Sequence, residues 1–187
     1  PRIRVELGKV NDYISGNTNL AMAMAKGDYF ALCDHDDLLT PDALYWVAKA
    51  IAEQGADMIY SDEDKMTEDG RRHTDPHFKP DFNPDLLTSV NYICHLFVAK
   101  KQLVAWVGGF RQEFDGAQDY DFIFRCTERA KRIHHIPKVL YHWRCHQDST
   151  ACNPESKLYA FEAGSRAIMA HYDRMGIPAE KVEKGVD

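Results

Sequence analysis

A short apolar run that ends in a cluster of aspartates constrains the fold of this chain more than any other feature. Residues 26–41 read KGDYFALCDHDDLLTP, in which the apolar run 29–33 precedes Asp34, Asp36 and Asp37. An almost wholly apolar run predicts a strand of a sheet that is buried on both faces. Open α/β folds bind ligands at the carboxyl ends of such strands, so we expect the three aspartates to lie at a ligand site.

Two interpretations of this aspartate cluster are open. Carboxylates this close repel one another unless a cation or hydrogen-bond donors neutralise them, and Mg²⁺ and Mn²⁺ prefer such oxygen ligands. The alternative is helix capping, because Thr40, Pro41 and Asp42 form a good helix start. Capping leaves the three preceding aspartates without a role, so we favour a metal site.

The order of the predicted elements indicates an α/β fold. The first of them are a strand at 2–7, a helix at 17–26, a strand at 29–33, a helix at 41–54 closed by Gly55, and a strand at 57–61. This alternation is typical of right-handed crossover units. We therefore predict a mostly parallel open sheet flanked by helices, in a single domain over residues 1–187.

An acidic segment with several prolines interrupts the alternation. Residues 62–85 contain few aliphatic side chains, so we predict a long loop, and loops of this length usually carry a function. Two interpretations are open: a lid that lies over the cleft with Phe78 and Phe82 as anchors, and a static surface excursion that these phenylalanines pack. Beyond it we predict a helix at 85–91, a strand at 93–100, a helix ending at Val107, a helix at 119–130, strands at 133–136 and 139–143, and a helix at 154–175.

Two further groups of polar residues follow. Residues 116–122, GAQDYDF, place Asp119 and Asp121 at a helix start, where the helix dipole keeps a carboxylate ionised and able to accept a proton from a hydroxyl. Stabilisation of the helix alone is the alternative. Residues 141–150, YHWRCHQDST, contain alternate polar side chains that could complete a metal shell or hold a phosphate, namely His142, Arg144 and His146.

Composition and charge exclude some classes of protein. The net charge of −6 and the pI near 5.8 argue against a nucleic-acid partner, because such binding depends on neutralising phosphates. The five cysteines include no C-x-x-C pair and several lie in apolar runs, so we expect buried free thiols in a reducing compartment. The chain shows neither a signal peptide nor an apolar segment of membrane-spanning length.

Four motifs follow one another along the chain: KGDYFALCDHDDLLTPDAL, GGF, GAQDYDF and YHWRCHQDST. This ordered set resembles family 2 glycosyltransferases with the A-type fold, in particular the branch of bacterial polysaccharide and O-antigen synthesis. The resemblance implies inverting transfer of a sugar from a nucleotide-sugar donor to an acceptor hydroxyl, with Mn²⁺ or Mg²⁺ as the cofactor. The implied acceptor is a glycan or a lipid-linked glycan.

The resemblance also implies roles for the aspartates. Asp34-His35-Asp36 matches the family's Asp-x-Asp motif, with Asp36 as the direct metal ligand and with Asp34 and Asp37 at the donor. Gln118-Asp119 matches the family's Glu-Asp motif, whose second residue is the catalytic base. Asp119 therefore takes that role, and Gln118 stands beside the donor in place of the usual Glu.

The last motif implies donor and metal contacts as well. Arg144 is expected near the donor diphosphate, and His146 is expected to bind the metal, with His142 as the alternative. The family's usual first strand, helix and second strand would precede Pro1. We therefore expect a piece of a longer protein or a truncated relative.

Two other functions stay open. One is a non-catalytic fragment of a glycosyltransferase. The other is a metal-dependent phosphohydrolase, although such an enzyme normally needs more histidine ligands than this sequence supplies. The expected location is the cytoplasm, with peripheral association at the inner face of the membrane through segments outside this chain.

Overall fold

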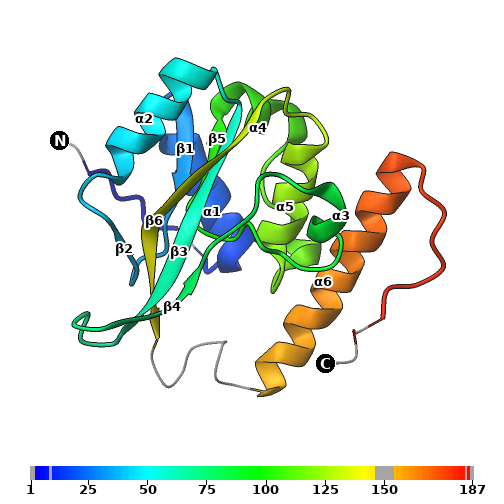
Figure 1. Ribbon diagram of the computed structural model, residues 1–187. Coiled ribbons are helices and arrows are strands. Elements are labelled where there is room, and N and C mark those ends of the chain that lie inside the picture. The colour runs from blue at the N-terminus through cyan, green and yellow to red at the C-terminus, as the bar shows by residue number, and fades with distance from the viewer. Residues whose placement is uncertain (1–2, 9, 146–153, 184, 186–187) are drawn as a thin grey trace.

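The protein is built on one six-stranded sheet with the strand order β1-β5-β3-β6-β2, and β4 pairs with β3 (Figure 1). The computed structural model describes residues 3–8, 10–145, 154–183 and 185. The strands are β1 (Tyr29–Leu32), β2 (Leu38–Leu39), β3 (Met58–Thr67), β4 (His73–His77), β5 (Phe97–Lys100) and β6 (Ile133–Cys145). The helices are α1 (Tyr13–Met24), α2 (Ala43–Gln54), α3 (Pro84–Leu87), α4 (Lys101–Val107), the 3₁₀ turn η1 (Gln112–Phe114), α5 (Gln118–Thr127) and α6 (Pro154–Met175).

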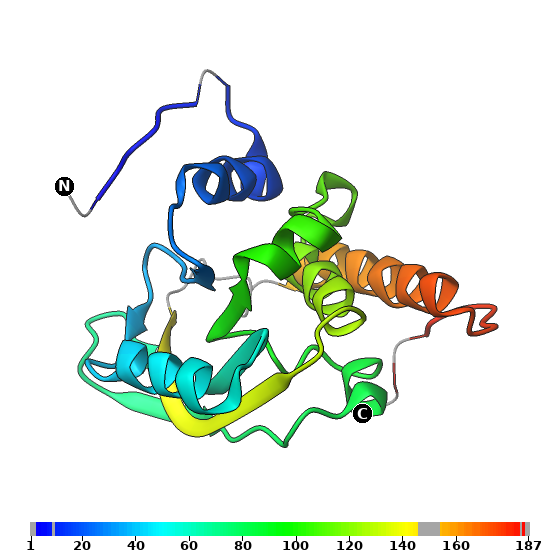
Figure 2. The ribbon, with the colours of Figure 1, turned by 90° about the horizontal axis from the view of Figure 1, so that it is seen from above.

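Helices cover both faces of the sheet, as the two views in Figures 1 and 2 show. On one face, Val47 of α2 shares an apolar cluster with Ile59 of β3. On the other face, α4, α5 and α6 enclose a larger cluster, in which Phe122 of α5 meets Phe97 of β5 edge-on with ring centroids 5.8 Å apart. This layered arrangement confirms the predicted α/β class.

Helix α2 begins and ends close to where the sequence predicts. Its apolar residues face the sheet, and Gly55 closes it with φ of 59° while its N–H donates to the Ile51 carbonyl at 3.0 Å. A left-handed residue at this position is a common helix terminator, and glycine adopts it without steric cost.

Replacing Gly55 with Ala should therefore lower the free energy of unfolding by about 1 kcal/mol, because a non-glycine residue in this conformation costs about 1–2 kcal/mol. The added Cβ would also lie 2.8 Å from Nη1 of Arg132. Gly164→Ala in α6 is the matched control, since its Cβ would have no neighbour closer than 3.8 Å, and it should stabilise the protein by about 0.5–1 kcal/mol. Urea unfolding of both variants measures this, and equal shifts would contradict it.

The sheet is mixed rather than mostly parallel. Among the described strands, only β3 and β6 pair in parallel, whereas β1–β5, β2–β6, β3–β4 and β3–β5 are antiparallel. β1 and β3 do run in the same direction, as the strand–helix–strand order predicts, but β5 lies between them. β1 therefore ends the strand order and is only partly buried, which contradicts the expectation that both of its faces are covered.

The N-terminal predictions are wrong in detail. Residues 3–8 form no strand, and Ile3, Val5 and Leu7 are exposed, because no described strand pairs with them. Helix α1 begins at Tyr13, so Asn17 and Thr18 lie inside the helix and do not cap it. An alternating pattern becomes a strand only where a neighbouring strand accepts its hydrogen bonds.

The predicted loop at 62–85 is largely a β-hairpin. β3 continues through Thr67 and β4 returns alongside it, with Met66 opposite His73. The prediction of a loop was wrong because β3 buries the acidic side chains of Asp62, Glu63 and Asp64, each of which is paired with a histidine or lysine. Phe82 packs against the larger apolar cluster as predicted, but Phe78 is exposed. A hairpin whose register shifts between Glu63 and Lys65 therefore replaces most of the predicted loop.

The C-terminal half follows the predictions more closely. α4 ends at Val107 and α6 spans Pro154–Met175, both as predicted. β6 is a single strand rather than two, because its pairing with β3 shifts register at Pro137, from Ile136 to Val139. α3 and β5 are shorter than the predicted helix and strand.

The cysteines do not all lie in the interior. Cys126 is buried, and this burial raises the pKa of its thiol to about 12. Cys94 and Cys145 are partly buried, Cys33 is exposed, and Cys152 lies outside the described residues. The expected burial is therefore confirmed for Cys126 alone among the described cysteines.

Candidate active site

The aspartate cluster lies in the turn between β1 and β2 and is anchored to β6 through Asp37. The Asp37 carboxylate is buried, accepts a hydrogen bond from the Tyr141 hydroxyl, and accepts another from the Arg144 backbone N–H at 2.8 Å. Burial, and then the bond to Asp37, raises the pKa of Tyr141, so this hydroxyl stays protonated. Asp37 thus fixes the turn and leaves the other two aspartates to face outward.

Asp34 and Asp36 are the accessible acids of the turn, with side chains 64% and 33% exposed. The protein atoms beneath Asp34 raise the pKa of its carboxyl by desolvation, although the outer surface of the side chain remains in solvent. His95 opposes this shift, whereas the charges of Asp37, Asp36 and Asp119 add to it. A carboxylate with this surplus of neighbouring negative charge favours a cation.

His95 is a member of the site that the sequence analysis missed. Its Nε2 lies 4.0 Å from Oδ2 of Asp34, and its ring stacks on Tyr141 with centroids 4.5 Å apart. Its Nδ1 is buried and has no hydrogen-bond partner among the described residues. The available signal was a histidine inside the apolar run 93–100, which periodicity alone assigns to a strand.

These residues fit a divalent cation. One ligand atom each from Asp34, Asp37 and His95 lies within 4.8 Å of the others, and two of these three ligands are carboxylates. Asp36, the ligand expected from the resemblance, is adjacent in the chain but outside this group of three. An oxygen-rich set that leaves positions open to other ligands suits Mg²⁺ or Mn²⁺ bound together with a phosphate.

The buried Lys79 fixes the backbone on either side of His95. Lys79 Nζ lies 3.2 Å from Oε2 of Glu63 and donates to the carbonyls of Ile93, at 2.7 Å, and His95. The same Glu63 oxygen accepts the His95 backbone N–H at 3.0 Å. Burial lowers the pKa of Lys79 and Glu63 opposes that shift. Glu63 and Lys79 thus hold the segment that carries His95.

Asp119 lies in the first turn of α5, beside a cavity. Asn91 Nδ2 donates to Oδ2 of Asp119 at 2.9 Å, and both residues line a cavity of about 600 Å³ between the segment after α3 and helices α5 and α6. Gln118 turns away from this carboxylate, because its Oε1 accepts the Gly116 N–H at 2.8 Å. Asn91 was also missed by the sequence analysis, since nothing local marks it.

Asp121, the other acid of this motif, does not face the cleft. Its side chain is fully buried and accepts hydrogen bonds from Arg111 Nε at 3.0 Å and Arg125 Nε at 2.9 Å. Asp121 therefore has a structural role within the predicted pair, and Asp119 is the accessible carboxylate.

The third predicted group divides between two places. Arg144 lies against the aspartate turn, where its Nε donates to the Asp36 carbonyl at 2.6 Å and its Nη1 to the Glu68 carbonyl at 2.5 Å. His142 turns instead to Asp64, with Nδ1 2.6 Å from Oδ1. His146 lies outside the described residues.

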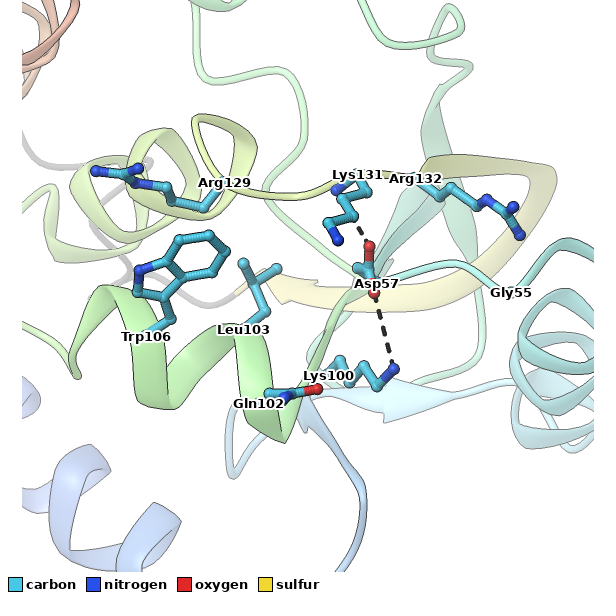
Figure 3. A pocket seen from close by; sticks show the side chains of 9 residues that line it. All are labelled: Gly55, Asp57, Lys100, Gln102, Leu103, Trp106, Arg129, Lys131 and Arg132. Carbon is cyan, nitrogen blue, oxygen red and sulfur yellow. Dashed lines mark hydrogen bonds and ion pairs between the residues drawn. The ribbon is translucent and has the colours of Figure 1, made fainter.

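The pocket drawn in Figure 3 is at the other end of the sheet. Its volume is about 570 Å³. Lys100 lines it and pairs with Tyr29 at the start of β1, whereas Asp34 follows the end of that strand. There the Asp57 carboxylate lies 3.9 Å from Lys100 Nζ and accepts a hydrogen bond from the backbone N–H of Lys131 at 3.1 Å (Figure 3). This pocket takes no part in the site of the aspartates.

Comparison with known proteins is consistent with this geometry. The family model described as Glycosyl transferase family 2 matches residues 1–104. An uncharacterised protein y4gI of Sinorhizobium fredii is 51% identical over 93% of this chain and 19% of its own length. The O-antigen biosynthesis protein RfbC of Myxococcus xanthus is 38% identical over 96% of this chain and 14% of its own length. The chain thus spans less than a fifth of the length of these relatives.

A solved structure shows the same fold. Residues 1–349 of S. aureus TarS, in complex with UDP, superpose with a TM-score of 0.60 at 18% identity, over 84% of this chain and 44% of that chain. None of the described helices is both long enough and apolar enough to cross a bilayer.

Proposed function

Since the chain belongs to glycosyl transferase family 2, we propose that it forms the catalytic part of an enzyme that transfers a sugar from a nucleotide-sugar donor to an acceptor hydroxyl during polysaccharide or O-antigen synthesis. The observation that carries the proposal is that one segment connects the two acidic groups. In this segment Asn91 donates to Asp119 at 2.9 Å, and His95 Nε2 lies 4.0 Å from Oδ2 of Asp34. The name of RfbC and the UDP bound to TarS support this substrate class.

Asp34, Asp37 and His95, whose ligand atoms lie within 4.8 Å of one another, are proposed to hold Mn²⁺ or Mg²⁺ beside the donor together with the neighbouring Asp36, and His146 is proposed as a further ligand. When bound, such an ion neutralises the diphosphate as it leaves. The Arg144 guanidinium, whose Nε donates to the Asp36 carbonyl, is proposed to contact the same diphosphate through its remaining N–H groups.

Asp119 is proposed as the general base of an inverting transfer. The side-chain amide of Asn91 donates a hydrogen bond to one carboxylate oxygen of Asp119 and fixes its position. The other oxygen is left to take the proton of the acceptor sugar's hydroxyl. The cavity of about 600 Å³ beside Asp119 has the volume of a small-ligand site and is proposed to bind the acceptor sugar. Gln118, through Gly116, positions the loop that leads into α5. The implied partners are the donor and a glycan or lipid-linked glycan in the cytoplasm, at the inner face of the membrane.

Calorimetry with nucleotide-sugar donors tests the proposal. In the full-length protein, donor binding should require Mn²⁺ or Mg²⁺, and Asp36→Ala should weaken metal-dependent binding by at least about tenfold, because one charged ligand near the diphosphate is lost. Glu53→Ala, at the exposed end of α2, is the control and should bind normally.

Donor binding that is independent of metal, or unchanged in Asp36→Ala, would contradict the metal assignment. No binding to any nucleotide sugar would favour a non-catalytic protein. Hydrolysis of a simple phosphomonoester without acceptor would favour a phosphohydrolase.

A further inference from the structure

A second group of metal-ligating side chains lies on strands β3, β4 and β6. His142 Nδ1 is 2.6 Å from Oδ1 of Asp64, and His73 Nδ1 is 3.1 Å from Oδ2 of the same carboxylate. The two imidazole rings meet edge-on with centroids 4.3 Å apart. Ligand atoms of these three residues, one from each, thus lie within 4.8 Å of one another.

This Asp–His–His group is separate from the proposed donor site. Asp64 pairs with His142 across β3 and β6, whereas the preceding pair, Glu63 and Tyr141, carries the contacts to His95. Because successive side chains of a strand point to opposite faces, the two groups lie on opposite faces of the same strands. His142, the predicted alternative to His146 as a ligand of the donor metal, thus contacts Asp64 rather than an aspartate of the turn.

The chemistry of the group suits zinc. Two imidazole nitrogens and one carboxylate oxygen form a common three-ligand set for Zn²⁺, with a fourth position for water. Asp64 and His142 are largely buried, with side chains 12% and 18% exposed, while His73 at 43% leaves the group open to solvent on one side. The 2.6 Å contact between His142 Nδ1 and Asp64 Oδ1 must widen to about 3.3 Å around a tetrahedral ion with bonds of about 2.0 Å.

We propose that Asp64, His73 and His142 bind Zn²⁺, or a divalent transition metal of similar preference, and that the ion fastens β4 to β6. The hairpin between β3 and β4 carries the Glu68 carbonyl that accepts from Arg144. Fixing β4 therefore also holds the hairpin against an arginine at the aspartate turn. This inference does not depend on the proposed transferase activity.

Zinc titration of the full-length protein tests the inference. The Asp36→Ala background weakens the donor metal site, and prior treatment with a chelator removes bound ions. Calorimetry with ZnCl₂ should show one site per chain, and adding His73→Ala should weaken its affinity by at least about 100-fold, since loss even of an outer-shell partner can cost up to about that factor. His77→Ala is the matched control, because His77 lies on the same strand with a similar exposure of 45% but pairs with Glu63.

Two further readouts distinguish a metal site from a hydrogen-bonded carboxylate. Co²⁺ should give the visible absorption of a tetrahedral site in the His77→Ala protein and not in the His73→Ala protein. Zn²⁺ should slow tryptic cleavage after Arg71 and Arg72, at the hairpin tip, only where His73 is present. Absence of zinc binding, or equal affinity in the His73→Ala and His77→Ala proteins, would overturn the proposal.

Discussion

Exchanging Asp119 for Asn is expected to lower kcat by at least about 100-fold, the lower end of the range for general-base catalysis and equivalent to about 2.7 kcal/mol of barrier. The amide keeps the size and planarity of the carboxylate and can still accept from Asn91, but it cannot take up the acceptor's proton. Donor affinity should change by less than about threefold, because Asp34, Asp36 and His95 remain in place. Single-turnover transfer and donor calorimetry on the full-length protein measure the two quantities.

Asp85→Asn is the control for this variant, since Asp85 is an exposed acid in the first turn of α3. It should retain full turnover. If Asp119→Asn also transfers sugar at that rate, Asp119 is not the base. Asp121 does not offer a replacement, because its carboxylate is fully buried between two arginines.

Exchanging Asp121 for Asn should destabilise the fold by about 3–5 kcal/mol, the usual cost of removing one partner from a buried ion pair. Arg125 would then remain buried with its charge uncompensated, although its guanidinium still donates to the carbonyls of Val107, Gly108 and Gly109. These bonds fix the end of α4 against α5. A displaced Arg125 should therefore also weaken the packing of the larger apolar cluster between these helices. Urea unfolding followed by circular dichroism measures the change in the free energy of unfolding.

Asp173→Asn, on the exposed surface of α6, is the matched control and should shift stability by less than about 0.5 kcal/mol. A loss in Asp121→Asn no larger than that of the control would show that the ion pair contributes little. Because the same variant leaves Asp34, Asp36 and His95 untouched, its residual folded fraction should still bind the donor. This separates a stability effect from a catalytic one.

The local features of the sequence determined much of the fold. The apolar spacing of α2, its stop at Gly55, the end of α4 at Val107 and the span of α6 all follow from helical periodicity and from the conformational preference of glycine. The aspartates after β1 and the acid at the start of α5 were likewise visible, because each is set by its immediate neighbours in the chain.

Tertiary structure alone decided the strand order and the membership of the two polar groups. Periodicity shows which side chains prefer burial, but it does not show which strand lies beside which, and so β5 between β1 and β3 could not be foreseen. His95 lies beside Asp34, and His142 lies beside Asp64 rather than at the predicted donor metal, because the fold brings distant segments together. Buried acids such as Glu63 led to the prediction of a loop because Lys79, which neutralises Glu63, follows it by 16 residues in the sequence and reaches it only in the folded chain.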